Sequence, residues 1–292
     1  MSRRQSAAKD IGTWQEESFG QVETVERACP LCRDDNCATP PSRFSLGRWV
    51  VKDCATCGFT YITSAPVYGA LSETMSWEKS AGLEAEWREA TWGIQNTLDR
   101  RTRWRMRLFP RKKMPALLAR FARPGPVVDL GCGQGAQLEG LAEGFVPHGI
   151  EISAAAAAKA DRRFSQRGGH AVAAPCLEGL RAFPDGHFTG ATLRSYLEHE
   201  LHPSEVLSEL HRVMADDGVV IVKVPNYGSW NRRLTGKRWC GFRHPDHLNY
   251  FTPASLAEMA RRCGFSAWQG LGWRLPTSDN MWAILRKQAI PR

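Results

Sequence analysis

A glycine-rich turn directly after a short apolar run limits the folds open to this chain more than any other feature. Residues 127–130 predict a buried strand, and Gly131, Gly133 and Gly135 follow it at alternate positions. Such glycines let the backbone approach a ligand closely where a strand of an α/β sheet leads into a helix. The spacing G-x-G-x-G differs from the G-x-G-x-x-G of dinucleotide-binding domains. The turn therefore predicts an α/β fold with a ligand site of a different kind.

Two acidic residues stand at the same predicted site. Asp129 precedes the first glycine by two residues, and its carboxylate offers an acceptor for an ammonium group, where a pyrophosphate would need bare N–H donors. Glu151 ends a second predicted strand, residues 146–151, and an acid there can accept hydrogen bonds from both ribose hydroxyls. The alternative is a structural glycine turn beside an incidental acid. The order of strand, acid, glycines, helix, strand and acid favours a ligand site.

Predicted strands and helices alternate along residues 122–292, which indicates one domain with a mostly parallel sheet covered by helices on both faces. Further strands are predicted over residues 171–173, 188–193, 219–224 and 280–287. Helices are predicted over residues 136–142, 154–160, 204–214 and 253–263. Ser153 is the predicted N-cap of the alanine-rich helix, and Gly218 and Gly264 are predicted to stop the last two helices.

Four of the nine cysteines form two Cys-x-x-Cys pairs with 21 residues between them, and these are Cys29 with Cys32 and Cys54 with Cys57. This is the spacing of a zinc ribbon, in which four thiolates surround one Zn²⁺ and leave no position open for catalysis. A segment as short as residues 27–62 could hardly fold without such a cross-link. The alternatives, a redox pair or unconnected thiols, do not explain two pairs among β-prone residues. We therefore expect a structural zinc ribbon here, with Cys37 as a bystander in preference to a substitute ligand.

The regions before and after this module have different compositions. Residues 1–26 are polar and predict a disordered tail, and residues 63–121 predict a helical linker or lid. Eight basic residues fall within residues 100–113, so much of the net charge of +9 is local. Such a stretch could bind phosphates, but it more often forms the solvated face of a helix. We favour the second interpretation, a solvated helix face.

The chain carries no run of 18 apolar residues that could span a membrane. Its N-terminus has arginines but no apolar segment behind them, which argues against a secretory signal. We therefore expect a cytoplasmic protein, in a compartment where thiols stay reduced.

The stretch VVDLGCGQGAQ resembles the first motif of class I S-adenosylmethionine-dependent methyltransferases, and the resemblance covers residues 111–292. It implies a Rossmann-like domain that binds S-adenosylmethionine against Asp129 and the three glycines. The stretch GIEIS is similar to the acidic end of the family's second strand, which gives Glu151 the ribose role. LRSYLEH resembles the end of the fourth strand, although Thr189 stands where the family commonly has aspartate. The resemblance further implies cofactor contacts at Cys176, Leu177 and Leu193.

A cysteine-paired ribbon before such a domain, with a later segment like WCGFRHPDHLNYF, resembles a bacterial methyltransferase subfamily. That resemblance implies O-methylation of a glycosyl or natural-product acceptor, a small molecule that carries sugar or phosphate groups. Two alternatives stay open. An RNA methyltransferase would use the basic stretch, although no nucleic-acid module stands out. A non-catalytic scaffold would dock a partner through the ribbon, although it would need neither the acids nor the glycines.

A hydroxyl acceptor profits from a base near neutral pH, which is a role that histidine fills. His199 follows the predicted fourth strand, and His247 lies in an aromatic-rich loop. We hypothesise that one of them is the base and that Tyr250 and Trp239 shape the acceptor pocket. The alternative is that His199 caps a helix and His247 packs beneath its loop. Glu198 beside His199 offers two ligands for a divalent ion, but the sequence shows no third.

Overall fold

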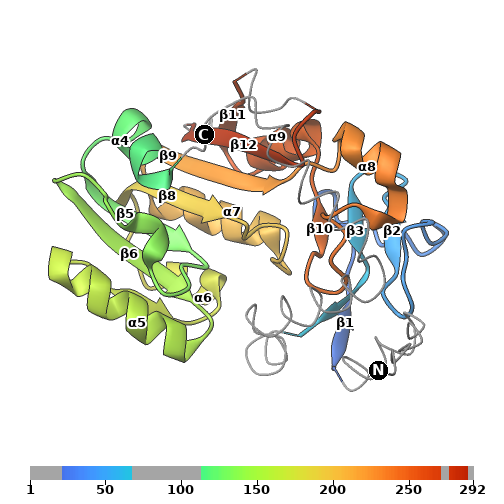
Figure 1. Cartoon of the computed structure of the whole chain (residues 1–292), viewed down its shortest axis with the longest axis horizontal. Helices are drawn as coiled ribbons and strands as arrows, with labels where there is room; N and C mark the ends of the chain where they lie inside the picture. Colours follow the sequence, from blue (N-terminus) through green and yellow to red (C-terminus); the bar gives the residue numbers. More distant parts are fainter. Residues whose placement is uncertain (1–21, 68–112, 271–275, 289–292) are drawn as a thin grey trace, which may run out of the picture.

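The computed structural model describes residues 22–67, 113–270 and 276–288. Figure 1 shows a large sheet flanked by helices and, beside it, a small group of short strands near the N-terminus. The predictions for residues 1–21 and for most of the linker, including the basic stretch up to residue 112, lie outside the described residues. No helix within the described ranges is both long and apolar enough to cross a membrane.

The large sheet has seven strands in the order β11-β12-β9-β8-β5-β6-β7. The five strands from β9 to β7 are parallel, whereas β12 runs antiparallel to β9, and β11 antiparallel to β12. The bounds are β5 Gly125–Leu130, β6 Phe145–Glu151, β7 Ala171–Ala173, β8 Phe188–Arg194, β9 Met214–Pro225, β11 Phe265–Trp268 and β12 Asn280–Lys287. The predicted Rossmann-like α/β fold is confirmed.

Both faces of this sheet are covered, as the continuous apolar runs predict. Adjacent strand residues belong to different cores: Val128 packs in one cluster and Val127 in the other. The first cluster contains buried residues of three helices, α6 Cys176–Arg181, α7 Pro203–Val213 and α9 Pro253–Arg262. The second contains buried residues of α4 Met114–Phe121 and α5 Ala154–Phe164.

The predicted signals at helix ends are partly confirmed. Ser153 caps α5, because its side chain accepts a hydrogen bond from the backbone N–H of Ala156 at 3.4 Å. Gly264 follows α9 with φ +84°, the left-handed conformation that ends a helix. Gly218 does not end α7, so that prediction was wrong. The helix stops at Val213, and the chain enters β9 at once, with Gly218 inside the strand.

Two other predictions of secondary structure differ from the fold. Residues 136–142 do not form an α-helix but one 3-10 turn, η1 Ala136–Leu138. Gly135 and Gly140 flank it in left-handed conformations, φ +83° and +77°, and leave no room for a second turn. Strand β11 was not predicted, because only two of its four residues are large and apolar and its main signal is its pairing with β12.

The N-terminal module consists of two small antiparallel pairings. Strand β1 Thr24–Glu26 pairs with β4 Ser64–Pro66, so the predicted tail in fact ends in an ordered strand. Strand β2 Val51–Asp53 pairs with β3 Thr60–Ile62. A third strand joins β3 from far along the chain, β10 Asn249–Tyr250, which also precedes α9.

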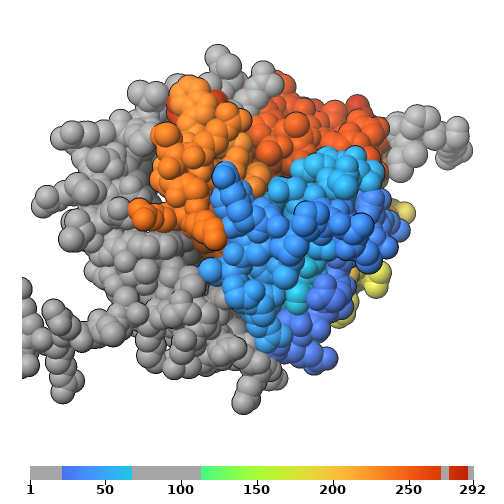
Figure 2. Space-filling view, turned by 90° about the vertical axis from the view of Figure 1, so that its right-hand side faces the viewer, coloured from blue at the N-terminus to red at the C-terminus, as the bar shows by residue number. Residues whose placement is uncertain are grey.

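Strand β10 joins the module to the α/β domain, and their cores are continuous. Phe59 and Tyr61 of the module belong to the same core cluster as α7 and α9. The ring of Phe59 lies 5.2 Å from that of Phe251. Figure 2 shows the module, in blue to cyan, against residues that follow β9, in orange to red; the latter include α8 Trp230–Thr235.

Candidate functional site

Asp129 lies near the end of β5, in the centre of the sheet, and is 1% exposed. Its Oδ1 accepts a hydrogen bond from Thr192 Oγ1 at 2.6 Å. Its Oδ2 is buried and has no hydrogen-bond partner among the described residues. Burial raises the pKa of Asp129 to about 7, although the Thr192 hydrogen bond acts in the opposite direction. A buried acceptor without a partner is costly, so this atom suits a donor supplied by a ligand, such as an ammonium group.

Glu151 ends β6, the strand beside β5, and holds the glycine turn in place. Its Oε2 accepts from the backbone N–H of Gly133 at 2.8 Å, and its Oε1 accepts from that of Ser153 at 3.0 Å. Each carboxylate oxygen can accept a further hydrogen bond. The fixed carboxylate can therefore still bind a pair of ribose hydroxyls.

The three glycines of the turn share a left-handed conformation but differ in their surroundings. All have left-handed φ angles, which favour glycine. A Cβ on Gly131 would lie 3.0 Å from the ring of Tyr196, and one on Gly135 would lie 3.1 Å from the ring of Phe164. A Cβ on Gly133 would meet nothing within 4 Å. Gly133 therefore leaves open space where a ligand can approach, whereas Gly135 permits the close packing of α5.

The other predicted cofactor residues lie in two environments. Cys176 and Leu177 begin α6; Cys176 is buried, with its Sγ 3.9 Å from the carbonyl oxygen of Ile150, and Leu177 is half-buried. Leu193 is fully buried, and its side chain packs in the core. The sequence analysis did not identify Thr192 or Tyr196 as residues of this site. Thr192 could have been found as a polar residue within the apolar run of β8.

The two cysteine pairs lie on turns with the same backbone hydrogen bonds. In each turn the carbonyl of the first cysteine accepts from the residue four positions later, Arg33 N to Cys29 O and Gly58 N to Cys54 O, both at 2.8 Å. Arg33 and Gly58 both have left-handed φ angles, 68° and 71°. The backbone N–H of the first cysteine of each pair also donates to the carbonyl oxygen of the residue five positions later. The two turns thus present their thiols in the same way.

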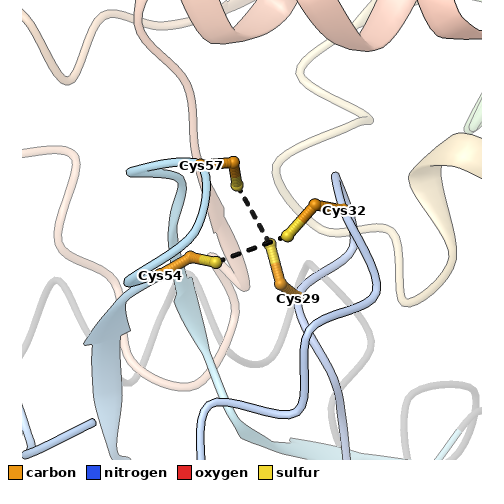
Figure 3. A group of neighbouring side chains, drawn as sticks. All are labelled: Cys29, Cys32, Cys54 and Cys57. Carbon is orange, nitrogen blue, oxygen red and sulfur yellow. Dashed lines mark hydrogen bonds between the residues drawn. The ribbon is translucent and has the colours of Figure 1, made fainter.

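Figure 3 shows that the four thiols of Cys29, Cys32, Cys54 and Cys57 converge on one point. The sulfur atoms lie within 4.8 Å of one another, with the shortest separations 3.4 and 3.5 Å. Zinc with bonds of about 2.3 Å to four sulfurs in a tetrahedron requires sulfur separations of about 3.8 Å. The arrangement is compatible with such an ion, and the exposed Cys37 is not part of it.

One thiol of this cluster is poised to ionise near neutral pH. Burial acts to raise the pKa of Cys54, but hydrogen bonds from the backbone of Cys57 and from the Asn36 side chain lower it to about 7. The Asn36 Nδ2 donates to Cys54 Sγ at 3.3 Å. Metal ions bind the thiolate form, so this environment favours ligation.

The two histidines proposed as bases lie close to each other and to Glu198. The rings of His199 and His247 are 4.7 Å apart and nearly perpendicular. The Nδ1 of His199 lies 2.9 Å from the carbonyl oxygen of Asp246, and the Nδ1 of His247 lies 2.8 Å from that of Gly241. A carbonyl only accepts, so each Nδ1 carries a proton.

Glu198 supplies the third group that the sequence did not show. It is 1% exposed, and its Oε2 has no hydrogen-bond partner within the described part of the chain. Potential ligand atoms of Glu198, His199 and His247 lie within 4.8 Å of one another, so the group could hold a divalent cation. Burial lowers the pKa of His199 to about 4 and raises that of Glu198 to about 7. His199 is therefore a neutral imidazole at neutral pH.

A short connection joins this group to the glycine turn. The loop after β8 carries Tyr196, whose ring packs on Gly131, and the backbone N–H of His199 donates to Tyr196 O at 2.9 Å. Trp239 and Tyr250, predicted to shape an acceptor pocket, are 1% and 3% exposed and pack in a core cluster with residues of the cysteine module. Their packing accounts for their aromatic character, and the pocket role stays a prediction.

Comparison with known proteins identifies the domain. Residues 101–269, more than half of the chain, match the family model described as "Methyltransferase domain". The fold is similar to a SAM-dependent methyltransferase from Archaeoglobus fulgidus, at 18% identity over 59% of this chain and 92% of that one, with a TM-score of 0.45. It is also similar to the 1,6-didemethyltoxoflavin-N1-methyltransferase of Burkholderia thailandensis, at 19% identity over 81% and 98%, with a TM-score of 0.48. No curated protein matches the sequence. The family match shows that the chain belongs to the methyltransferase domain family and is an S-adenosylmethionine-dependent methyltransferase.

Proposed function

We propose that the protein methylates a hydroxyl group of a glycosyl or natural-product acceptor. The observation that carries this proposal is the pair of imidazoles, His199 and His247, which come from two loops and lie 4.7 Å apart. The loop of His199 is connected through Tyr196 to the glycine turn. Transfer to a hydroxyl needs an acceptor for its proton, and a neutral imidazole is suited to that task. Transfer to a more basic nitrogen would need no such group.

The cofactor would lie over the turn between β5 and η1. Asp129 would accept a hydrogen bond from its ammonium group through the unpartnered Oδ2, and Glu151 would accept from its ribose hydroxyls. S-adenosylmethionine supplies a methyl group on a sulfonium. The backbone at Gly133 would approach it, and the start of α6 at Cys176 and Leu177 would border its adenine. Alignment of two reactants in such a site can contribute about 7–11 kcal/mol.

One of the two histidines is the proposed base. His199 is unprotonated at neutral pH, because burial and the nearby Arg243 lower its pKa. After it takes the proton of the acceptor, the carboxyl group of Glu198, within 4.8 Å, would stabilise the imidazolium. The alternative is that both histidines only brace their loops through the Nδ1 contacts with backbone carbonyls.

The cysteine cluster would bind one structural Zn²⁺. The matched turns, the converging sulfurs and the lowered pKa of Cys54 support this assignment, and four thiolates leave no open coordination position. We also propose a cytoplasmic location, where a reducing environment would keep the thiols of the four clustered cysteines available to a metal ion.

The test is to incubate the purified protein with S-adenosylmethionine labelled in its methyl group and with fractions of a cell extract. Label in a sugar-containing small molecule supports the proposal, and label in RNA overturns it in favour of the RNA alternative. RNA binding would also weaken steeply with added salt. No transfer to any fraction would favour the scaffold.

The variants His199→Ala and His247→Ala test the base. His170→Ala is the control, because His170 is exposed and directly precedes β7 at the far edge of the sheet. Loss of the base is expected to lower turnover about 10²- to 10⁴-fold while cofactor affinity is retained. Turnover that is unchanged in both loop variants would remove the histidines from the mechanism.

A further inference from the structure

Asn249 of β10 connects the cysteine module to the loop that carries His199. It is 2% exposed, and every polar atom of its side chain is hydrogen-bonded. On one side, Nδ2 donates to the carbonyl oxygens of Leu197 and Glu200, at 2.8 and 2.7 Å. On the other side, Oδ1 accepts from Arg27 Nη2 at 2.8 Å. One side chain thus holds two segments that lie 222 residues and about 50 residues away in the sequence.

The loop from residue 195 to residue 200 depends on these contacts for its conformation. It is not a helix or strand, and Ser195 has a left-handed φ of 53°. Three of its carbonyls, at residues 197, 198 and 200, point to β10, where Asn249 or the backbone N–H groups of Leu248 and Asn249 bond to them. Buried carbonyls must be paired, so the loop follows the position of β10.

The position of β10 in turn follows the cysteine module. Asn249 lies opposite Tyr61 of β3 in the antiparallel pairing. The hydroxyl of Tyr61 accepts from Asn36 Nδ2 at 3.2 Å, and the same nitrogen donates to Cys54 Sγ at 3.3 Å. The Asn36 Oδ1 accepts from the backbone of Ala55 at 2.9 Å. Hydrogen bonds and strand pairing therefore connect the sulfur of Cys54, through Asn36 and Tyr61, to Asn249 and the loop.

We propose that Asn249 is a positioning residue for methyl transfer, through which the cysteine module sets the place of Glu198 and His199. This inference rests on the proposed function, which puts the acceptor hydroxyl beside that loop. On this view the module is part of the acceptor side of the enzyme and not an independent appendage. A simple edge pairing between β10 and β3 would need no buried side-chain amide, whereas the carbonyls of Leu197 and Glu200 do.

The variant Asn249→Asp separates positioning from general packing. It has the same shape and keeps an acceptor for Arg27, but it places a carboxylate oxygen where Nδ2 donated to two carbonyls. The loop should therefore move while β10 stays paired. Ser204→Ala is the matched control, because Ser204 Oγ donates to Pro30 O and so joins the module to α7 without touching the loop.

A displacement of about 1 Å at a reacting group can cost about 10²-fold in rate. We expect Asn249→Asp to lower kcat by about tenfold to a hundredfold, with the acceptor KM, the affinity for S-adenosylhomocysteine and the bound zinc close to those of the wild type. Ser204→Ala should keep kcat within about twofold, because it removes one part-buried hydrogen bond that does not touch the loop. Hydrogen exchange of the backbone N–H groups of His199 and Leu248 should quicken only in Asn249→Asp.

Equal kcat in Asn249→Asp and wild type would overturn the proposal. Parallel loss of kcat, cofactor affinity and zinc would also overturn it, because that pattern means general unfolding. Should Asn249→Asp fail to fold, Arg27→Met carries the test: it cuts only the module side, and an unchanged kcat there refutes the coupling. If the wild type methylates no acceptor, the proposed function fails, while the hydrogen-exchange comparison still decides the role of Asn249.

Discussion

Replacement of Asp129 by asparagine should stabilise the fold and at the same time weaken cofactor binding. The buried carboxylate has one hydrogen bond, from Thr192, and one oxygen without a partner among the described residues. Asparagine keeps the acceptor for Thr192 and removes the buried charge. The wild-type residue is thus expected to be costly for stability and useful for the ligand.

The magnitude follows from the pKa. A rise from the ordinary 3.8 to about 7 corresponds to about 4 kcal/mol of unfolding free energy at 1.36 kcal/mol for each pKa unit. Because the folded-state pKa lies above the unfolded value, the stability contributed by the protonated group is complete below pH 3.8 and is lost as the pH rises to about 7. The new amide Nδ2 lacks an acceptor, which costs about 1–3 kcal/mol. The net gain at pH 8 is therefore about 1–3 kcal/mol.

Urea unfolding followed by tryptophan fluorescence, at pH 8 and at pH 4.5, measures this effect. Asp129→Asn should be the more stable protein at pH 8 and should lose that advantage at pH 4.5. Calorimetry with S-adenosylhomocysteine should show binding weakened about tenfold to a hundredfold, since an acceptor for a charged group is worth about 1.5–3 kcal/mol. A variant that is less stable than wild type at pH 8, or that binds with unchanged affinity, would refute the reasoning.

Three further predictions concern other parts of the protein. Gly133→Ala should weaken cofactor binding with a small loss of stability, whereas Gly135→Ala, crowded by Phe164 and Ala160, should destabilise by about 1–3 kcal/mol in thermal unfolding; equal effects in both assays would contradict the distinct roles of the two glycines. Burial and the neighbouring His170 and His187 lower the pKa of His148 from 6.5 to about 4, so about 3 kcal/mol of stability should be lost as the pH falls from 6.5 to 4; His148→Phe should flatten that dependence in urea titrations, and an unchanged pH profile would count against it. Cys57→Ser should reduce zinc measured by mass spectrometry from one equivalent per chain and lower the melting temperature, while Cys37→Ser should change neither; zinc retained in Cys57→Ser would exclude the four-sulfur site.

The sequence predicted those elements whose signals are local. Strand β6 and helix α5 follow from an apolar run and from the cap at Ser153. The turn η1 was mistaken for a helix because helix propensity does not show that two flanking glycines adopt left-handed conformations. The strand β11 was missed because its pairing with β12 is a tertiary feature.

The same distinction between local and distant signals holds for the candidate site. Asp129, Glu151 and the glycines follow one another closely along the chain, so their spacing carried the signal. The grouping of Glu198 and His199 with His247 joins residues almost 50 positions apart, and Asn249 joins segments still farther apart. Tertiary contacts, such as the hydrogen bonds from Leu248 and Asn249 to the carbonyl of Glu198, bring these residues together, and no local pattern encodes them.

The central claim is that this chain binds S-adenosylmethionine, with the ribose held by Glu151. Calorimetric titration with S-adenosylhomocysteine tests it most directly, with Glu151→Ala and a nicotinamide dinucleotide as comparisons. We expect one equivalent to bind to the wild type, much weaker binding to the variant, and no heat from the dinucleotide. Heat from the dinucleotide alone, or equal affinity in the wild type and Glu151→Ala, would contradict the claim.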